Sequence, residues 1–302
     1  MLAKRIAAHH FSNAPQTLTP IVGKGSVNHI FLVARDGAEI VIRLSDIHDQ
    51  ERALRFYEKE RWCIEQATAL GIPGPTVLAL DVMDERPYML QTRVRGLNGE
   101  DSTLGDKAIC FTLGQYARRI HSITLSGFGE DLADFHRSDG MAQWRRWVNY
   151  NSDSLTEDDP LLALGVYSPK QTPAIRHCFE LLKTQQVVLA LNHGDLSARN
   201  TVVDESGHIT LLDWGCAEAH LVPHYDLLCM MQQDNFREAQ LQAFVAGYGL
   251  SADEFARVRV ELNGLRLLKA FDLVRWAIDR NPARVQEKVK RARYILQQLA
   301  LT

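Results

Sequence analysis

The hydrophobic pattern divides the chain into an early part rich in strand-like segments and a later part dominated by helical spacing. Four β-branched and apolar runs predict the strands of a small sheet: residues 30–34, 39–44, 76–81 and 87–94. The first two flank Arg35-Asp36-Gly37, which predicts a β-hairpin. Between the pairs, apolar residues recur at helical spacing from Asp49 to Leu70, and the Gly- and Pro-rich residues 71–75 predict the end of that helix.

After Gly96 the pattern becomes helical. Helices are predicted over residues 106–122, locally within 131–160, over 172–189, and over 226–301 with breaks near 247–249 and 281–282. Two short apolar runs interrupt them, Thr201-Val202-Val203 and residues 209–212, on either side of the turn Asp204-Glu205-Ser206-Gly207. This arrangement predicts a tight hairpin.

The residues around this hairpin carry the clearest chemical signal in the chain. His193-Gly194-Asp195-Leu196 precedes it, Asn200 follows four residues after Leu196, and Asp213-Trp214-Gly215 comes directly after it. This order matches the kinase signature H-x-D-L-x-x-x-N followed by D-F-G. Asp195 could accept a proton from a hydroxyl, while Asn200 and Asp213 offer the hard oxygen ligands that Mg²⁺ prefers.

On these residues, the segment from Leu191 to Gly215 resembles the catalytic segment of the aminoglycoside phosphotransferase and choline kinase-like family of small-molecule kinases. Trp214 replaces the Phe of D-F-G. The resemblance implies a two-lobed, protein-kinase-like α+β fold with an antiparallel-sheet N-lobe and a mainly helical C-lobe. It implies a nucleotide-binding lobe over residues 1–91, a catalytic and substrate-binding lobe over 92–302, and a hinge near 91–96. ATP and Mg²⁺ are the implied cofactors.

Further nucleotide-binding residues are expected from the early part of the chain. The loop before the first hairpin carries Gly23, Gly25, Ser26 and Asn28. Glycines let a backbone approach phosphate closely, although two glycines before a strand are also common in a plain turn. In the hinge, the resemblance implies backbone contacts from Thr92 and Val94 to adenine.

The residue expected to bind the nucleotide phosphates departs from the kinase pattern. Arg43 stands where a kinase carries Lys, which preserves the positive charge but not the shape. The helix from Asp49 to Leu70 is expected to supply a glutamate that pairs with Arg43. Its candidates are Glu51, Glu58, Glu60 and Glu65. Glu60 is preferred, because the context Lys59-Glu60-x-Trp62 resembles relatives.

The sequence signal for an acceptor-binding site is weaker. Residues 131–160 hold Trp144, Trp147 and Tyr150, followed by an acidic run made of Asp153, Glu157, Asp158 and Asp159. Aromatic faces and carboxylates suit a cationic acceptor. The same residues also fit ordinary packing and a solvated loop.

Two residues outside the motif are expected to support the structure. His121 ends a predicted helix, and the resemblance implies that it packs in the C-lobe. Asp226 resembles a family aspartate that starts the next helix, as a cap or a brace for the catalytic loop. No A-P-E motif follows Asp213-Trp214-Gly215, which argues against a protein kinase.

Composition narrows the setting. The chain has 302 residues, is 46% hydrophobic, and carries a net charge of −3, so no broad basic surface indicates nucleic acid. The basic stretch over 284–293 has an apolar stripe and predicts a solvated helix face. The five cysteines show no C-x-x-C spacing, and no signal peptide or long apolar span is evident. A cytoplasmic location and no membrane partner are expected.

These observations predict ATP-dependent transfer of the γ-phosphoryl group to a hydroxyl of a small molecule. The family resemblance favours an aminoglycoside or a related amino alcohol or sugar as the acceptor. Choline, homoserine, a macrolide or another sugar are alternative acceptors. A nucleotide-binding pseudokinase scaffold is the alternative of a different class, because Arg43 departs from the pattern. The oligomeric state is not predicted.

Overall fold

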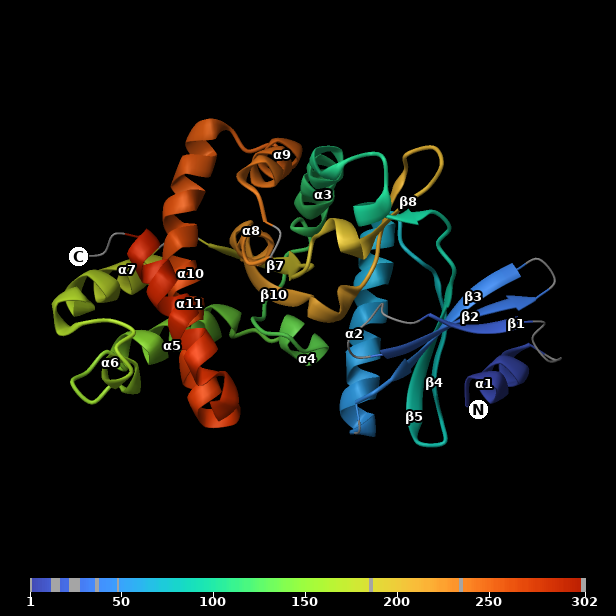
Figure 1. Ribbon diagram of the computed structural model, residues 1–302, viewed down its shortest axis with the longest axis horizontal. Helices are drawn as coiled ribbons and strands as arrows, with labels where there is room; N and C mark the ends of the chain where they lie inside the picture. Colours follow the sequence, from blue (N-terminus) through green and yellow to red (C-terminus); the bar gives the residue numbers. More distant parts are fainter. Residues whose placement is uncertain are drawn as a thin grey trace.

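A computed structural model describes residues 2–11, 17–21, 28–35, 38–47, 49–184, 187–233 and 236–299. A five-stranded antiparallel sheet lies at one end of the molecule and a larger, mostly helical part at the other (Figure 1). The strand order is β1-β2-β3-β5-β4. The strands are β1 Thr17–Ile21, β2 Asn28–Arg35, β3 Ala38–Ser45, β4 Val77–Met83 and β5 Arg86–Thr92. The α+β fold predicted from the sequence is confirmed.

Two helices flank this sheet. Helix α1 (Leu2–His10) packs on one side, and α2 (Gln50–Ala69) lies on the side that faces the helical part (Figure 1). Because side chains alternate along a strand, Ile42 and Leu44 of β3 pack with α1, while Arg43 between them points toward α2. The hydrophobic pattern had predicted α2 within one residue at each end, but it had not indicated α1 or β1.

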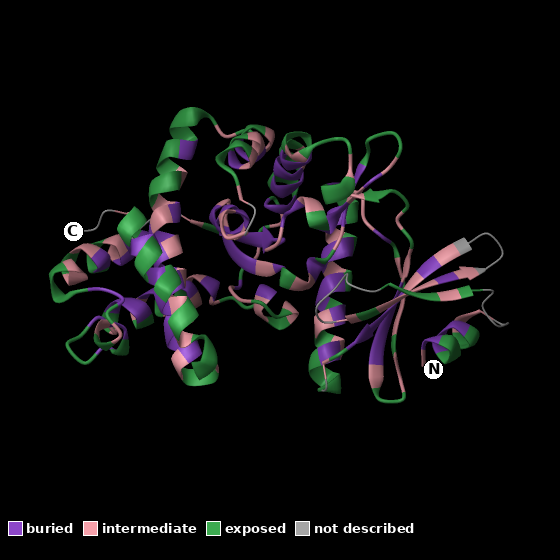
Figure 2. Cartoon of the chain, in the orientation of Figure 1, coloured by how far each residue is buried: buried purple, intermediate pink, exposed green. Residues whose placement is uncertain are grey.

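Among the described residues, the helical part surrounds the larger of two hydrophobic cores, and the buried residues of this core line the inner faces of its helices (Figure 2). Its helices are α3 Asp106–Ile120, α4 Leu132–Phe135, α5 Gly140–Asp153, α6 Pro160–Ala163, α7 Thr172–Thr184, α8 His224–Met231, α9 Glu238–Tyr248, α10 Ala252–Arg280 and α11 Val285–Gln298. In α11, Val289 and Ala292 are buried, as the predicted apolar stripe requires. No described helix is both long enough and apolar enough to cross a membrane.

One predicted helix was too long. The helix expected over 172–189 ends at Thr184, and Val188–Asn192 instead forms strand β7, paired antiparallel with β10 (Glu218–Val222). The residues from Leu189 to Asn192 are buried, so a short apolar run had the character of a strand inside the core. This strand leads directly into His193, and therefore positions the segment that begins there.

The hairpin predicted after Asn200 is present. Strands β8 (Thr201–Val203) and β9 (Ile209–Leu211) pair antiparallel, and β6 (Leu97–Asn98) adds to the edge of β8. The chain thus reaches from the end of β5, through the predicted hinge, onto the hairpin of the helical part.

Candidate active site

The loop after β7 is braced by a buried aspartate from α8. Asp226 is fully buried and accepts hydrogen bonds from the backbone N–H groups of His193 (3.2 Å) and Gly194 (2.7 Å). His121 Nε2 lies 3.0 Å from the same carboxylate. Burial alone would raise the pKa of Asp226, but these hydrogen bonds outweigh it and lower the pKa below its usual 3.8. Asp226 and His121 therefore hold the loop in shape, and the buried His121 agrees with the structural role predicted for it.

Glycine is the one residue type that fits position 194 of the loop. Its φ is +78°, and a Cβ built there would lie 2.0 Å from the carbonyl oxygen of Cys216. The loop before Asp195 therefore passes directly against the backbone that follows Asp213-Trp214-Gly215.

Hydrogen bonds connect Asp195, Asn200 and the residue that precedes Asp213. Asn200 Nδ2 donates to the Asp195 carbonyl (2.9 Å), and Leu212 N–H donates to the Asn200 carbonyl (2.8 Å). His193 Nε2 lies 3.0 Å from the Leu212 carbonyl, and its ring packs on Trp214 with centroids 4.6 Å apart. The hairpin thus returns the chain beside the loop, as its length and turn had predicted.

The donors of this cluster fit a magnesium ion. The side-chain amide nitrogen of Asn200 donates its hydrogen bond to the Asp195 carbonyl. The Oδ1 atom of Asn200 accepts no hydrogen bond from the residues that the structure describes. Asp213 is exposed and has a left-handed backbone with φ +60°. Within those same residues there is no cluster of three or more His, Cys, Asp or Glu side chains suited to a metal. One carboxylate and one amide suit Mg²⁺, which is commonly held by few protein ligands together with substrate phosphates.

Across from this cluster, Arg43 and Glu60 form a buried ion pair. Arg43 Nη1 lies 2.5 Å from Glu60 Oε2, and Nη2 lies 2.9 Å from Oε1. Burial alone would lower the pKa of Arg43, but the Glu60 carboxylate outweighs it and raises the pKa. Asp213 also contributes to this electrostatic environment. Of the four glutamates considered from the sequence, Glu60 is the one that meets Arg43.

The other predicted nucleotide-binding residues are placed unevenly. Gly23, Gly25 and Ser26 lie outside the described residues. Asn28 begins β2, and its Oδ1 accepts a hydrogen bond from the Tyr57 hydroxyl (2.8 Å). Asn28 is therefore joined to α2.

In the predicted hinge, the Thr92 N–H donates to the Thr76 carbonyl (2.9 Å), so an adenine contact at Thr92 could only use its carbonyl. Val94 lies beyond the end of β5, and its backbone makes no backbone–backbone hydrogen bond with another described residue. Of the two hinge residues, Val94 is thus the one whose backbone could both donate and accept.

Three of the residues considered for a cationic acceptor are already buried or paired within the protein. Trp144 is fully buried, and Asp159 is bound by Arg275 through two hydrogen bonds (2.6 and 2.9 Å). The Lys269 ammonium lies 5.7 Å from the ring centroid of Trp147. Because the chain's own residues occupy these partners, Trp144 and Asp159 serve packing, and the face of Trp147 already meets a cation.

Two residues of the site were missed by the sequence interpretation. Arg199 Nη2 lies 2.9 and 2.7 Å from the two carboxylate oxygens of Asp195. Lys59 of α2 is buried, and its Nζ donates to the carbonyl of Gly215. A cation four residues after Asp195 was visible in the sequence, whereas nothing in the spacing of Lys59 indicated its partner.

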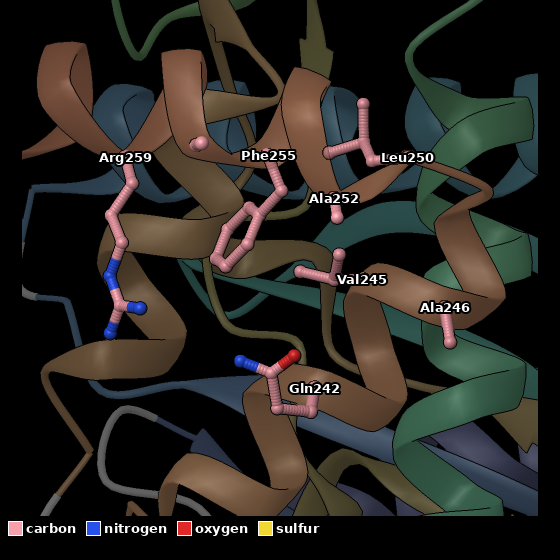
Figure 3. A pocket seen from close by; sticks show the side chains of 8 residues that line it. Gln242, Val245, Ala246, Leu250, Ala252, Phe255 and Arg259 are labelled. Carbon is pink, nitrogen blue, oxygen red and sulfur yellow. The ribbon is translucent and has the colours of Figure 1, made fainter.

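A separate hollow of about 380 Å³ lies between α9 and the start of α10 (Figure 3). Its floor is apolar, with Val245, Leu250 and Phe255, and Arg259 stands at one end. Arg259 is paired with Glu238 and lies over the Phe255 ring. None of the predicted site residues lines this hollow.

Solved structures of phosphotransferases resemble the whole chain. An aminoglycoside phosphotransferase APH(4)-Ia variant, in a ternary complex with AMP-PNP and hygromycin B, matches with a TM-score of 0.66 at 18% identity, over 100% of both chains. Spectinomycin phosphotransferase APH(9)-Ia, in complex with ADP and spectinomycin, matches with 0.53 at 17% identity, over 99% of this chain and 97% of that one. Macrolide 2′-phosphotransferase MphH from Brachybacterium faecium matches with 0.59 at 18% identity, over 96% and 97%.

Because each sequence identity is 18% or less, these structural likenesses establish the fold alone. Comparison with curated protein sequences gives no match. The model of the phosphotransferase enzyme family (APH) matches residues 17–261, which include β1 to β10 and therefore every residue of the cluster described above. The chain belongs to the phosphotransferase enzyme family.

Proposed function

We propose that this small-molecule phosphotransferase transfers the γ-phosphoryl group of ATP to a hydroxyl of an aminoglycoside or of a related amino alcohol or sugar. One observation carries the proposal: the hydrogen bonds that join Asp195, Asn200 and the residue before Asp213, together with the Arg43–Glu60 pair. Phosphoryl transfer needs a group that orients and deprotonates the hydroxyl, ligands for a metal, and a cation for the nucleotide phosphates. These residues meet all three needs.

In this proposal each residue has one task. Asp195 receives the proton of the acceptor hydroxyl, and its backbone carbonyl is fixed by Asn200. Asn200 and Asp213 would hold Mg²⁺, which neutralises charge on the phosphates when it is bound. Arg43, oriented by Glu60, contacts the α- and β-phosphates. Val94 and the carbonyl of Thr92 would contact adenine, and Gly23, Gly25, Ser26 and Asn28 would form or flank the loop over the phosphates.

The division of the chain is part of the same proposal. Residues 1–91 would form the nucleotide-binding lobe, and residues 92–302 the catalytic and acceptor-binding lobe, with the hinge near 91–96. The end of β5 at Thr92 supports this boundary, because the chain there leaves the five-stranded sheet for the helical part. A cytoplasmic location, where ATP is available, fits this function.

The acceptor class is supported by the proteins that share the fold. Those relatives are described with hygromycin B and spectinomycin, and as acting on macrolides. Antibiotic resistance is thus one biological role that the proposal allows. At identities of 18% or less, however, acceptor-binding loops differ widely on one fold, so the acceptor must be found by assay.

The test is a screen for ADP release with Mg²⁺ and ATP. The panel contains hygromycin B, kanamycin, spectinomycin, a macrolide, choline, homoserine and simple sugars. We expect turnover with at least one member of the panel, and its product should carry one added phosphoryl group by mass spectrometry. Nucleotide binding without phosphorylation of any panel member would favour the pseudokinase alternative instead.

A further inference from the structure

The side chain of Arg199 is bonded to the residue proposed to receive the proton. Its Nη2 lies 2.9 Å from Asp195 Oδ1 and 2.7 Å from Oδ2. We propose that Arg199 is a positioning residue of the phosphoryl-transfer site, which orients the Asp195 carboxylate and sets a permanent positive charge beside the phosphoryl group in transfer. This inference rests on the proposed function.

The backbone that carries Arg199 is held firmly. Ala198–Asn200 forms one short 3-10 turn, and Asn98 Nδ2 donates to the Arg199 carbonyl (2.7 Å). Gly99 lies so close to this turn that an added Cβ would be 2.5 Å from the Ala198 carbonyl oxygen. The guanidinium therefore extends from a fixed base, which favours a defined position over a freely moving surface side chain.

The geometry leaves the guanidinium with unused donors. A single nitrogen, Nη2, serves both oxygens of Asp195, and the other guanidinium nitrogens make no hydrogen bond or ion pair within the part of the chain that the structure describes. The side chain is 56% exposed, whereas that of Asp195 is 20% exposed. A guanidinium offers five N–H donors, so several remain for an anion that enters beside Asp195.

The position matters for the chemistry of transfer. The acceptor oxygen loses its proton to Asp195 and forms a bond to the γ-phosphorus, while the bond from that phosphorus to the bridging oxygen breaks and its electron pair leaves with ADP. A proton acceptor must lie about 2.6–3.2 Å from the oxygen it deprotonates. With Arg199 bonded to the same carboxylate, its guanidinium would lie within roughly 6 Å of that oxygen.

A fixed charge at this place acts chiefly on the transition state. Negative charge spreads over the phosphoryl oxygens during transfer, and a preorganised cation lowers the energy of that arrangement. Arg stays charged at every working pH. As an exposed ion pair, in contrast, the same contact would contribute little to folding. If Arg199 acts on the transition state, its removal should lower turnover and leave stability nearly unchanged. If it only supports folding, turnover should fall only together with stability.

The test compares Arg199→Met, which keeps an apolar stem but removes the charge, with Arg199→Lys. Arg284→Ala is the matched control, because Arg284 is 49% exposed and pairs with a glutamate three residues away on α11. Turnover is measured with the best acceptor of the panel, and transfer of the ATP γ-phosphoryl group to water is followed in the absence of acceptor. Melting temperature is recorded for each variant.

We expect Arg199→Met to lower kcat by about 10²-fold or more, with KM for ATP within about threefold of wild type. Arg199→Lys should recover part of the loss, and Arg284→Ala should match wild type. All melting temperatures should agree within about 3 °C. An Arg199→Met protein with more than half of the wild-type kcat, or one whose activity falls only together with its melting temperature, overturns the inference. If wild type itself transfers phosphoryl to no acceptor and not to water, the proposed function fails first, and the role of Arg199 with it.

Discussion

Lys59 of α2 donates a hydrogen bond from Nζ to the carbonyl oxygen of Gly215, at 3.0 Å, and a second to that of Ala217, at 3.1 Å. The side chain is buried, and the next residue along α2, Glu60, holds Arg43 of the sheet. Two successive residues of one helix thus connect the sheet and the segment that carries Asp213. The position of α2 is therefore linked to the geometry of the proposed metal site.

Replacing Lys59 should impair both folding and turnover. Lys59→Met leaves two carbonyl oxygens without their donor, which costs about 1–3 kcal/mol in the free energy of unfolding. Loss of the link to Gly215 should also reduce kcat by about tenfold or more. Urea unfolding and steady-state kinetics measure the two effects. Arg61→Ala, which removes an exposed pair with Glu65 on the same helix, is the control and should leave both quantities unchanged.

Breaking the buried pair should weaken nucleotide binding. Glu60→Gln leaves the Arg43 guanidinium buried without its counter-charge, which costs about 3–5 kcal/mol of stability. It also frees Arg43 from its orientation, so KM for ATP should rise by about tenfold or more. ATP titrations and chemical unfolding check the two values. Unaltered affinity in a folded Glu60→Gln protein would show that the pair does not orient a phosphate-binding group.

Substitutions at two glycines with similar backbone conformations distinguish the cost of backbone strain from the cost of a steric clash. Gly194 (φ +78°) and Gly207 (φ +83°) both have left-handed backbones, but a Cβ at Gly207 meets nothing within 4 Å. Gly207→Ala should therefore cost only about 1–2 kcal/mol. Gly194→Ala adds a clash with the Cys216 carbonyl and should cost several kcal/mol more and abolish most turnover. Equal unfolding free energies for the two variants would contradict the close approach.

A buried histidine should make stability depend on pH. His220 is buried against Tyr225, with ring centroids 4.1 Å apart. Burial, and then the charges of Lys269 and His224, lower its pKa well below 6.5. The unfolded chain takes up a proton at this histidine near pH 6.5 and the folded chain does not. The contribution of neutral His220 to the free energy of unfolding is therefore complete above that pH. It is lost as the pH falls toward the lower folded value.

The slope from this histidine should reach about 1.4 kcal/mol per pH unit below pH 6.5. His220→Phe removes the titrating group, so the stability difference between variant and wild type should change across pH 5.0–6.5 and stay constant above about pH 7.5. Urea unfolding at several pH values measures it. A difference that is constant over the whole range would contradict a lowered pKa at His220.

The sequence was informative where chemistry and spacing coincide. The arrangement of Asp195, Asn200 and Asp213 around one hairpin could be predicted, because motif spacing and a tight turn are short-range features of the sequence. Strand β7 was mistaken for the end of a helix, because an apolar run of five residues has no clear period and its partner, β10, lies about 30 residues away. The pattern also gave no sign of α1.

Long-range side-chain partners were harder to predict. The pairing of Arg43 with an acid from α2 was expected from the kinase-like order, and Glu60 is the residue that meets it. The bonds of Lys59 to a segment 156 residues away depend on how α2 packs, which no local pattern encodes. For the same reason, Trp144 and Asp159 were compatible with a binding site until their burial and partners were known.

The most direct test of the account is a single-turnover transfer of labelled γ-phosphoryl from ATP to the acceptor found in the screen, with wild type, Asp195→Asn and Asp279→Asn compared at equal nucleotide saturation. Asp279 is an exposed aspartate near the end of α10 and outside every candidate site, so its variant controls for the loss of one charge. The account predicts that Asp195→Asn transfers about 10²-fold more slowly or worse, while it binds ATP as wild type does and Asp279→Asn is unaffected. Transfer by Asp195→Asn at the wild-type rate would contradict it.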